Sequence, residues 1–156
     1  MKLRFLFFIT SITFLILGCK NSTQSVSKKA SIKLDFAYAL PVQLIFYSLK
    51  FTSGDTVYIK EHFQPQTDTS SYAILNKEER LKIDSIIMNM NLSALDTRYD
   101  SHVIDGEEYK LNISKNDTLK EIFIHESEVP GELSSLIDYI TELKTKLKRY
   151  SLDKRN

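Results

Sequence analysis

The chain has 156 residues, of which 42% are hydrophobic and 26% are charged, so it suits one domain with one core and does not have the composition of a disordered protein. Its 21 basic and 20 acidic residues leave a formal charge of +1, and two of the basic residues, Lys2 and Arg4, stand close to the N-terminus. A nearly neutral chain lacks the basic excess of nucleic-acid-binding proteins, so no nucleic-acid partner is expected.

The sequence predicts a secretory signal peptide over residues 1–18. Lys2 and Arg4 form a positive start, and residues 5–17 form an apolar run that only three hydroxyl-bearing residues interrupt. Gly18 then supplies a small residue at the cleavage site, which completes the three parts of such a leader. The run is shorter than the roughly 20 apolar residues that a permanent membrane-spanning helix needs.

The residues Ile16, Leu17, Gly18 and Cys19 resemble the lipobox of bacterial lipoproteins. The resemblance implies cleavage between Gly18 and Cys19, lipidation of the Cys19 thiol and acylation of the new N-terminus. The membrane is then a partner through Cys19, and Lys20 favours the outer membrane of the cell envelope over the inner one. Two other interpretations of this single cysteine remain open: a free thiol in an uncleaved signal anchor, and half of an intermolecular disulfide.

Three further segments follow the leader. Residues 19–31 comprise the lipidated cysteine and a polar, serine-rich tether, whose flexible part has an expected r.m.s. span of about 20 Å. Residues 32–150 are expected to form a single α+β domain. Residues 151–156 are expected to be a frayed basic tail.

Alternation of apolar and polar residues predicts strands in the first half of the domain. The apolar positions of the first strand are Ile32, Leu34, Phe36 and Tyr38, and Pro41 ends it. Residues 42–51 and 56–63 then form a hairpin, which is followed by a loop over residues 64–75.

The sequence of the second half of the domain predicts a helix, another hairpin and a final helix. Asn76 and Glu79 have the spacing of a helix-capping box, and an apolar stripe follows them. The hairpin turns at Asn116 and Asp117. Pro130 suits the first turn of the final helix.

This order of elements predicts an α+β fold: an antiparallel, meander-like sheet of about 4–5 strands with two amphipathic helices packed on one face. The layout is similar to that of small lipoproteins of Bacteroidota-type bacteria. In those proteins a helix and a Leu-x-x-Leu segment precede an Asp-Gly-x-x-aromatic turn, as Leu92, Leu95, Asp105, Gly106 and Tyr109 do here. The resemblance covers residues 42–147 and implies no known activity.

Residues 92–106 are the most site-like segment, because a connection of this length without clean periodicity is unusual in a compact domain. Its candidate binding residues are Arg98, Tyr99, Asp100, His102 and Asp105. Their spacing matches no standard zinc or calcium motif, so no metal is expected. A structural role, in which apolar residues hold the loop against the core, is favoured over a catalytic one.

No catalytic motif is present: the chain has no Gly-x-Ser-x-Gly elbow, no glycine-rich phosphate loop and no His-Glu-x-x-His helix. We therefore expect neither enzymatic activity nor a cofactor. The favoured interpretation is a lipid-anchored envelope module that binds a small ligand or an envelope protein. Its binding surface is expected on the uncovered face of the sheet, which is expected to bear Tyr38, Tyr47 and Tyr58.

Two alternatives remain. The protein is either a protective or inhibitory lipoprotein that blocks an enzyme or a toxin, or an enzyme that uses the loop at residues 96–105. The enzyme alternative requires Arg98, Asp100, His102 and Asp105 to converge in one concave pocket.

Overall fold

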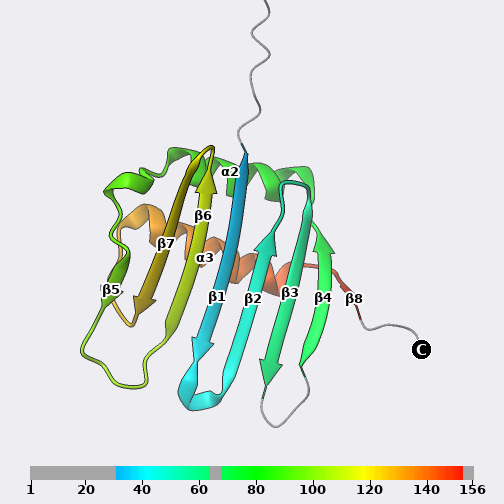
Figure 1. Ribbon diagram of the computed structural model, residues 1–156. Coiled ribbons are helices and arrows are strands. Elements are labelled where there is room, and N and C mark those ends of the chain that lie inside the picture. Colours follow the sequence, from blue (N-terminus) through cyan, green and yellow to red (C-terminus); the bar gives the residue numbers. More distant parts are fainter. Residues whose placement is uncertain (1–30, 64–67, 153–156) are drawn as a thin grey trace, which may run out of the picture.

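The computed structural model describes residues 31–63 and 68–152, which form one eight-stranded sheet and two α-helices (Figure 1). The predicted leader, Gly18, Cys19 and the tether up to residue 30 lie outside the described residues. The strands are β1 (Ile32–Leu40), β2 (Ile45–Phe51), β3 (Thr56–Phe63), β4 (Thr69–Ile74), β5 (Arg98–Asp100), β6 (Glu108–Lys115), β7 (Thr118–His125) and β8 (Arg149–Ser151). The helices are α2 (Lys77–Asn89) and α3 (Gly131–Lys146), with short 3₁₀ turns η1 (Pro41–Gln43) and η2 (Leu92–Ala94).

The expected antiparallel sheet of about 4–5 strands is wrong, because the sheet has eight strands and is mixed. The strand order is β5-β7-β6-β1-β2-β3-β4-β8, and β5 runs parallel to β7 while all other pairs are antiparallel. The central strand is β1, which pairs with β2 on one side and with β6 on the other. This long-range pairing joins the two predicted hairpins into one sheet.

Three strands were missed. β4 lies in the predicted loop, and it pairs with β3 although its residues are mostly small or polar. β5 and β8 have three residues each, which is too short for an alternating pattern to be recognised. Ser151, expected to open the frayed tail, belongs to β8, and the next residue, Leu152, donates its backbone N–H to Ser70 O at 2.9 Å.

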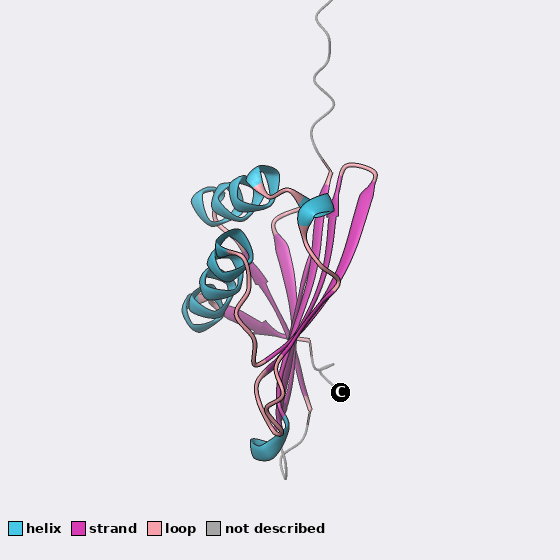
Figure 2. Cartoon of the chain, turned by 90° about the vertical axis from the view of Figure 1, so that its left-hand side faces the viewer, coloured by secondary structure: helices cyan, strands magenta, loops and turns pink. Residues whose placement is uncertain are grey.

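Both helices lie on the same side of the sheet (Figure 2). Because side chains alternate along a strand, one set of strand residues packs beneath the helices and the other set lies on the uncovered face. The covered set includes Leu34, Phe36, Leu49, Phe51, Val57, Ile59, Leu111, Ile113, Ile122 and Ile124, all of which are buried. This core joins the strands to the apolar stripes of both helices.

The capping box predicted for α2 is confirmed. Asn76 Oδ1 accepts a hydrogen bond from the Glu79 backbone N–H at 2.9 Å, and Glu79 Oε2 accepts one from the Asn76 backbone N–H at 2.7 Å. Ile83 and Ile87 then face the core. The α2 helix also holds the β2–β3 turn, because Arg80 Nη1 donates to the carbonyl oxygens of Thr52 and Gly54, each at 2.6 Å.

The final helix, α3, buries an apolar stripe of Leu133, Leu136, Ile137, Ile140 and Leu143. Pro130 is its N-cap and stands one residue before the first turn. Lys144 and Lys146 lie in the last turn, where cations interact favourably with the helix dipole.

We expect Asn76→Ala to lower the free energy of unfolding by about 1 kcal/mol, because the Glu79 N–H loses its acceptor. Urea denaturation followed by circular dichroism measures this change. Asn89→Ala, at the exposed end of the same helix, is the matched control and should not destabilise the protein. Equal stability of Asn76→Ala and the wild type would show that the cap contributes nothing.

Candidate functional site

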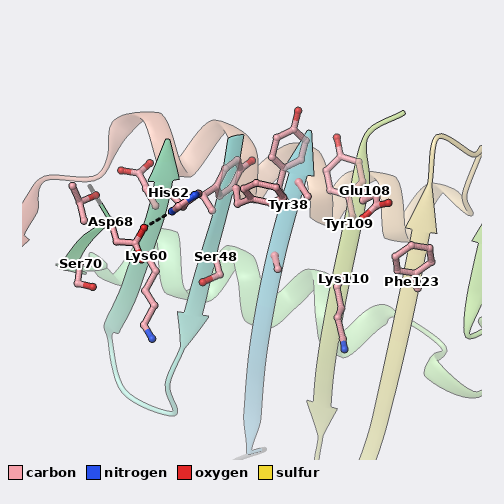
Figure 3. Close-up of a pocket in the computed structure, with 16 residues that line it drawn as sticks. Tyr38, Ser48, Lys60, His62, Asp68, Ser70, Glu108, Tyr109, Lys110 and Phe123 are labelled. Carbon is pink, nitrogen blue, oxygen red and sulfur yellow. Dashed lines mark hydrogen bonds and ion pairs between the residues drawn. The ribbon is translucent and has the colours of Figure 1, made fainter. Parts of the chain in front are cut away.

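The uncovered face of the sheet contains a groove along β1 and β2, with a volume of about 450 Å³ (Figure 3). Its floor is made of the small residues Ala37, Ala39 and Ser48. Larger side chains border it: Phe46 from β2 itself, and Lys60, His62, Glu108, Lys110 and Phe123 from the flanking strands. The groove exists because small residues on the two central strands lie between long residues on the flanking strands.

Two lysines face the groove from opposite sides. Strand register aligns Lys110 with Ala37, Ala37 with Ser48 and Ser48 with Lys60, so the four residues form one row across β6, β1, β2 and β3. Figure 3 shows both lysine side chains extending along the sheet in the same direction on either side of the floor. Lys110 Nζ pairs with Glu121 Oε1 at 2.7 Å. The Lys60 side chain makes no ion pair or hydrogen bond with any residue in the described ranges.

A second hollow of about 260 Å³ continues the groove along the same face. It shares Ala37, Ser48, Lys60 and Lys110 with the first hollow. It adds the side chains of Asp35, Lys50, Tyr58 and Asn112. Lys50 Nζ lies 4.0 Å from Asp35 Oδ2, and both side chains are largely exposed. The two hollows therefore form one elongated site with the lysine pair at its middle.

Aromatic side chains stand on both sides of the first hollow. The Phe46 ring lies 5.8 Å from the His62 ring, and His62 Nδ1 is paired with Asp68 Oδ1. On the far side, the Arg98 guanidinium lies 4.7 Å from the centroid of the Phe123 ring. His62 lies on the same face of β3 as Tyr58 and Lys60.

The expectation that Tyr38, Tyr47 and Tyr58 share the uncovered face is wrong for two of them. Tyr58 is on that face and is 43% exposed, whereas Tyr47 is buried in the core and Tyr38 packs against it. The reason is that successive side chains of a strand alternate between the two faces of the sheet. Tyr38 follows Leu34 and Phe36 at steps of two and must share their face. The alternation in the sequence contained this signal.

Tyr38 and Tyr109 both bind the carboxylate of Glu107, at one end of the sheet and on its covered side. Tyr38 Oη donates to Glu107 Oε1 at 3.1 Å, and Tyr109 Oη donates to Glu107 Oε2 at 2.6 Å. Burial and then the Glu107 carboxylate raise the pKa of Tyr38 to about 12, and the same causes raise the pKa of Tyr109. Both hydroxyls therefore stay protonated at neutral pH and act as fixed donors.

The predicted loop cluster forms only in part. Arg98 Nη2 lies 2.7 Å from Asp100 Oδ2, and His125 Nδ1 lies 3.1 Å from Asp100 Oδ1. Hydrogen bonds from Arg98 and then from His125 lower the pKa of Asp100. His125 was missed because it joins the cluster through the parallel β5–β7 pairing, which the sequence does not reveal.

The other candidates in that loop point elsewhere. Tyr99 lies on the covered side, where its hydroxyl accepts from the Asp96 backbone N–H at 3.0 Å. His102 and Asp105 are exposed, and neither side chain forms a hydrogen bond or ion pair with Arg98 or Asp100. The convergence of Arg98, Asp100, His102 and Asp105 that the enzyme alternative requires is therefore not found.

A close approach fixes the C-terminal end of this loop. Asp105 has a positive φ of 70°, and Gly106 is buried against Glu126. A Cβ on residue 106 would lie 2.5 Å from Glu126 Cβ, so the position requires glycine. Glu126 Oε2 in turn accepts from the Glu107 backbone N–H at 2.8 Å, which fixes the backbone next to the shared carboxylate.

Residues 31–63 and 68–152 contain neither a cluster of metal-ligating side chains nor a membrane-spanning helix. No group of three or more His, Cys, Asp and Glu side chains in these ranges is arranged to hold a metal ion. Neither α2 nor α3 is long and apolar enough to cross a membrane.

No family model matches the chain, and no curated protein matches it at a significant level.

Glu61 connects the groove wall to the C-terminal elements. Its carboxylate binds Lys144 Nζ at 2.8 Å and Arg149 Nη1 at 2.5 Å, and its side chain is only 10% exposed. Burial alone would raise the pKa of Glu61. The hydrogen bond and charge of Lys144, together with Arg149, outweigh burial and lower the pKa below its usual value. The Lys144 ammonium also lies 4.1 Å from the centroid of the Tyr47 ring.

We expect Glu61→Gln to reduce the free energy of unfolding at pH 7 by about 1–2 kcal/mol, because the charge-assisted bonds to Lys144 and Arg149 are lost. A carboxyl group whose pKa is lowered by folding stabilises the protein above its unfolded-state pKa, and this stabilisation is lost as the pH falls through the folded-state pKa. The stability difference between the two proteins should therefore shrink below about pH 4.

Denaturant titrations of both proteins between pH 3 and pH 7 measure this difference. Glu121→Gln is the matched control, because Glu121 makes an exposed ion pair that is worth little. A stability difference that stays constant across this pH range would contradict the assigned role of the Glu61 charge.

Proposed function

We propose that this protein is a lipid-anchored, cell-envelope binding module that holds a small ligand in the groove on the uncovered face of its sheet. The observation that carries the proposal is the groove itself. The first hollow, at about 450 Å³, falls within the range of roughly 300–1,000 Å³ typical of small-molecule sites. Apolar floor, aromatic sides and a few charged groups are the usual composition of such sites.

The charges at the groove are available to a ligand. Lys110 and Glu121 are 55% and 62% exposed in their side chains, and such exposed ion pairs contribute at most about 1 kcal/mol. Glu108, on the same strand as Lys110, forms no ion pair with another residue of the described chain. A bound ligand can therefore replace the existing contacts at little cost.

The position of the groove is compatible with an anchor at Cys19. The tether would enter β1 at Ile32, where the strand begins at one end of the sheet (Figure 1). The first hollow lies farther along the strand, at Ala37 and Ala39. At a rise of about 3.3 Å per residue, Ala39 lies about 23 Å along the strand from Ile32. The first hollow would then lie on the side of the domain away from the anchored end.

The binding proposal is tested by filling the groove. We expect a small-molecule extract of the native envelope to raise the Tm of the wild-type protein, because a ligand that binds only the folded state stabilises it. Ala37→Trp places an indole on the groove floor and should abolish the shift. Ser114→Trp, on the same face of β6 but outside both hollows, is the matched control and should retain it. An extract that shifts no protein, or shifts all three equally, would contradict the proposal.

The anchor is tested separately by mass spectrometry of the protein isolated from its native membrane. We expect a mature chain that begins at Cys19 and carries acyl groups on the thiol and on the new N-terminus. Cys19→Ala should accumulate with residues 1–18 still attached. A native product that keeps its leader and has an unmodified Cys19 would remove the anchor from the proposal.

A further inference from the structure

The middle of the groove is positively charged over an uncharged floor. Lys60 and Lys110 stand three strand spacings apart, about 14 Å between their backbones, with only Ala37 and Ser48 between them. Lysine is a flexible point charge with three donors and does not require a bidentate partner. Because these side chains are flexible, two of them on either side of a floor of small residues can turn inward and bind an anionic group between them.

The edges of the groove carry hydrogen-bond acceptors. Glu108 borders the first hollow and Asp35 borders the second. Ionised carboxylates only accept hydrogen bonds, so their suitable partners are N–H or O–H donors. A polyanion with closely spaced charges would be repelled by these groups, and an acid with a purely apolar body would leave them unpaired.

Aromatic surfaces lie along the same path. Phe46 is 36% exposed, Tyr58 is 43% exposed, and Phe123 borders the groove from β7. The face of an aromatic ring is electron-rich and attracts the weakly positive C–H groups of a ring laid against it. From Asp35 to Ala39 the floor extends about 13 Å, which accommodates a chain of two or three rings.

We infer that the ligand of the groove is a short acidic saccharide, whose carboxylate binds between Lys60 and Lys110 while its hydroxyl groups donate to Glu108 and Asp35. A sugar ring supplies C–H faces for the aromatic side chains and hydroxyl donors for the carboxylates. A uronic acid adds the single negative charge that the lysine pair requires. This inference rests on the proposed function, because it names the class of ligand for the same groove.

The inference is tested by calorimetric titration of the full-length chain in detergent with galactose-based trisaccharides that carry one uronic acid (galacturonic, glucuronic or mannuronic acid), called uronic-acid trimers below, and with neutral galactotriose. We expect at least one uronic-acid trimer to bind at least tenfold more tightly than galactotriose. Lys60→Gln and Lys110→Gln should each weaken that binding roughly tenfold, the loss typical of a charge-assisted hydrogen bond.

Lys33→Gln is the matched control. Lys33 lies on the uncovered face of the same central strand but borders neither hollow, so this variant should bind as the wild type does. Affinity should also fall with rising salt for the wild type, and less steeply for Lys60→Gln. The Tm of each variant without ligand verifies that it is folded.

Binding of none of the uronic-acid trimers, equal binding of galactotriose, or unchanged binding by Lys60→Gln would each overturn the inference. If it fails while the envelope extract still shifts the wild type but not Ala37→Trp, the groove binds another chemistry and the proposed binding function stands. If the extract also gives no groove-dependent shift, both proposals fall.

Discussion

The structure depends on the central position of β1, which pairs over most of its length with β2 and with β6. Strand geometry alternates its side chains between the two faces of the sheet. Leu34 and Phe36 therefore lie in the core beneath the helices, while Asp35 and Ala37 lie on the uncovered face. One strand thus supplies the centre of the core and the floor of the groove.

The same strand backbones carry both the groove residues and the core residues, because side chains alternate between the two faces. The row formed by Lys110, Ala37, Ser48 and Lys60 lies on the uncovered face, and the residues next to these four in their strands pack on the covered side. Phe36 lies before Ala37, Tyr47 before Ser48 and Tyr109 before Lys110, and the Phe36 ring lies 6.2 Å from Tyr47 and 6.0 Å from Tyr109. The backbone that carries the row is therefore held by a close-packed interior. A site held in this way loses little conformational freedom when a ligand binds.

Local features of the fold were predictable because their signals lie within a few residues. The Asn76–Glu79 capping box, the turn at Asn116 and the buried stripe of α3 all follow from short-range chemistry, and the structure contains each of them. The pairing of β1 with β6 joins Ile32 to Lys115 across 83 positions of the chain. No local pattern specifies such a partner, so the strand count and the mixed topology did not follow from the sequence.

The groove was hidden for a related reason. Ala37 and Ser48 are unremarkable in the sequence, and they form a floor only because long side chains happen to flank them in register. Residues with conspicuous chemistry were predicted to form the site instead. Tyr38 and Tyr47 were predicted on the wrong face, although the alternation of side chains along each strand indicated otherwise.

The C-terminal elements show how the covered side supports the groove wall. Lys144 from α3 and Arg149 from β8 both bind Glu61, which follows Lys60 in β3. Because neighbouring strand residues face opposite sides, fixing Glu61 beneath the sheet leaves the Lys60 side chain on the uncovered face. Arg149 Nη2 also donates to the Lys144 carbonyl at 3.2 Å, so the end of α3 and the edge strand are held together. The low exposure of Glu61 makes this cluster more than a surface ion pair, and its loss would loosen the strand that carries one of the two facing lysines.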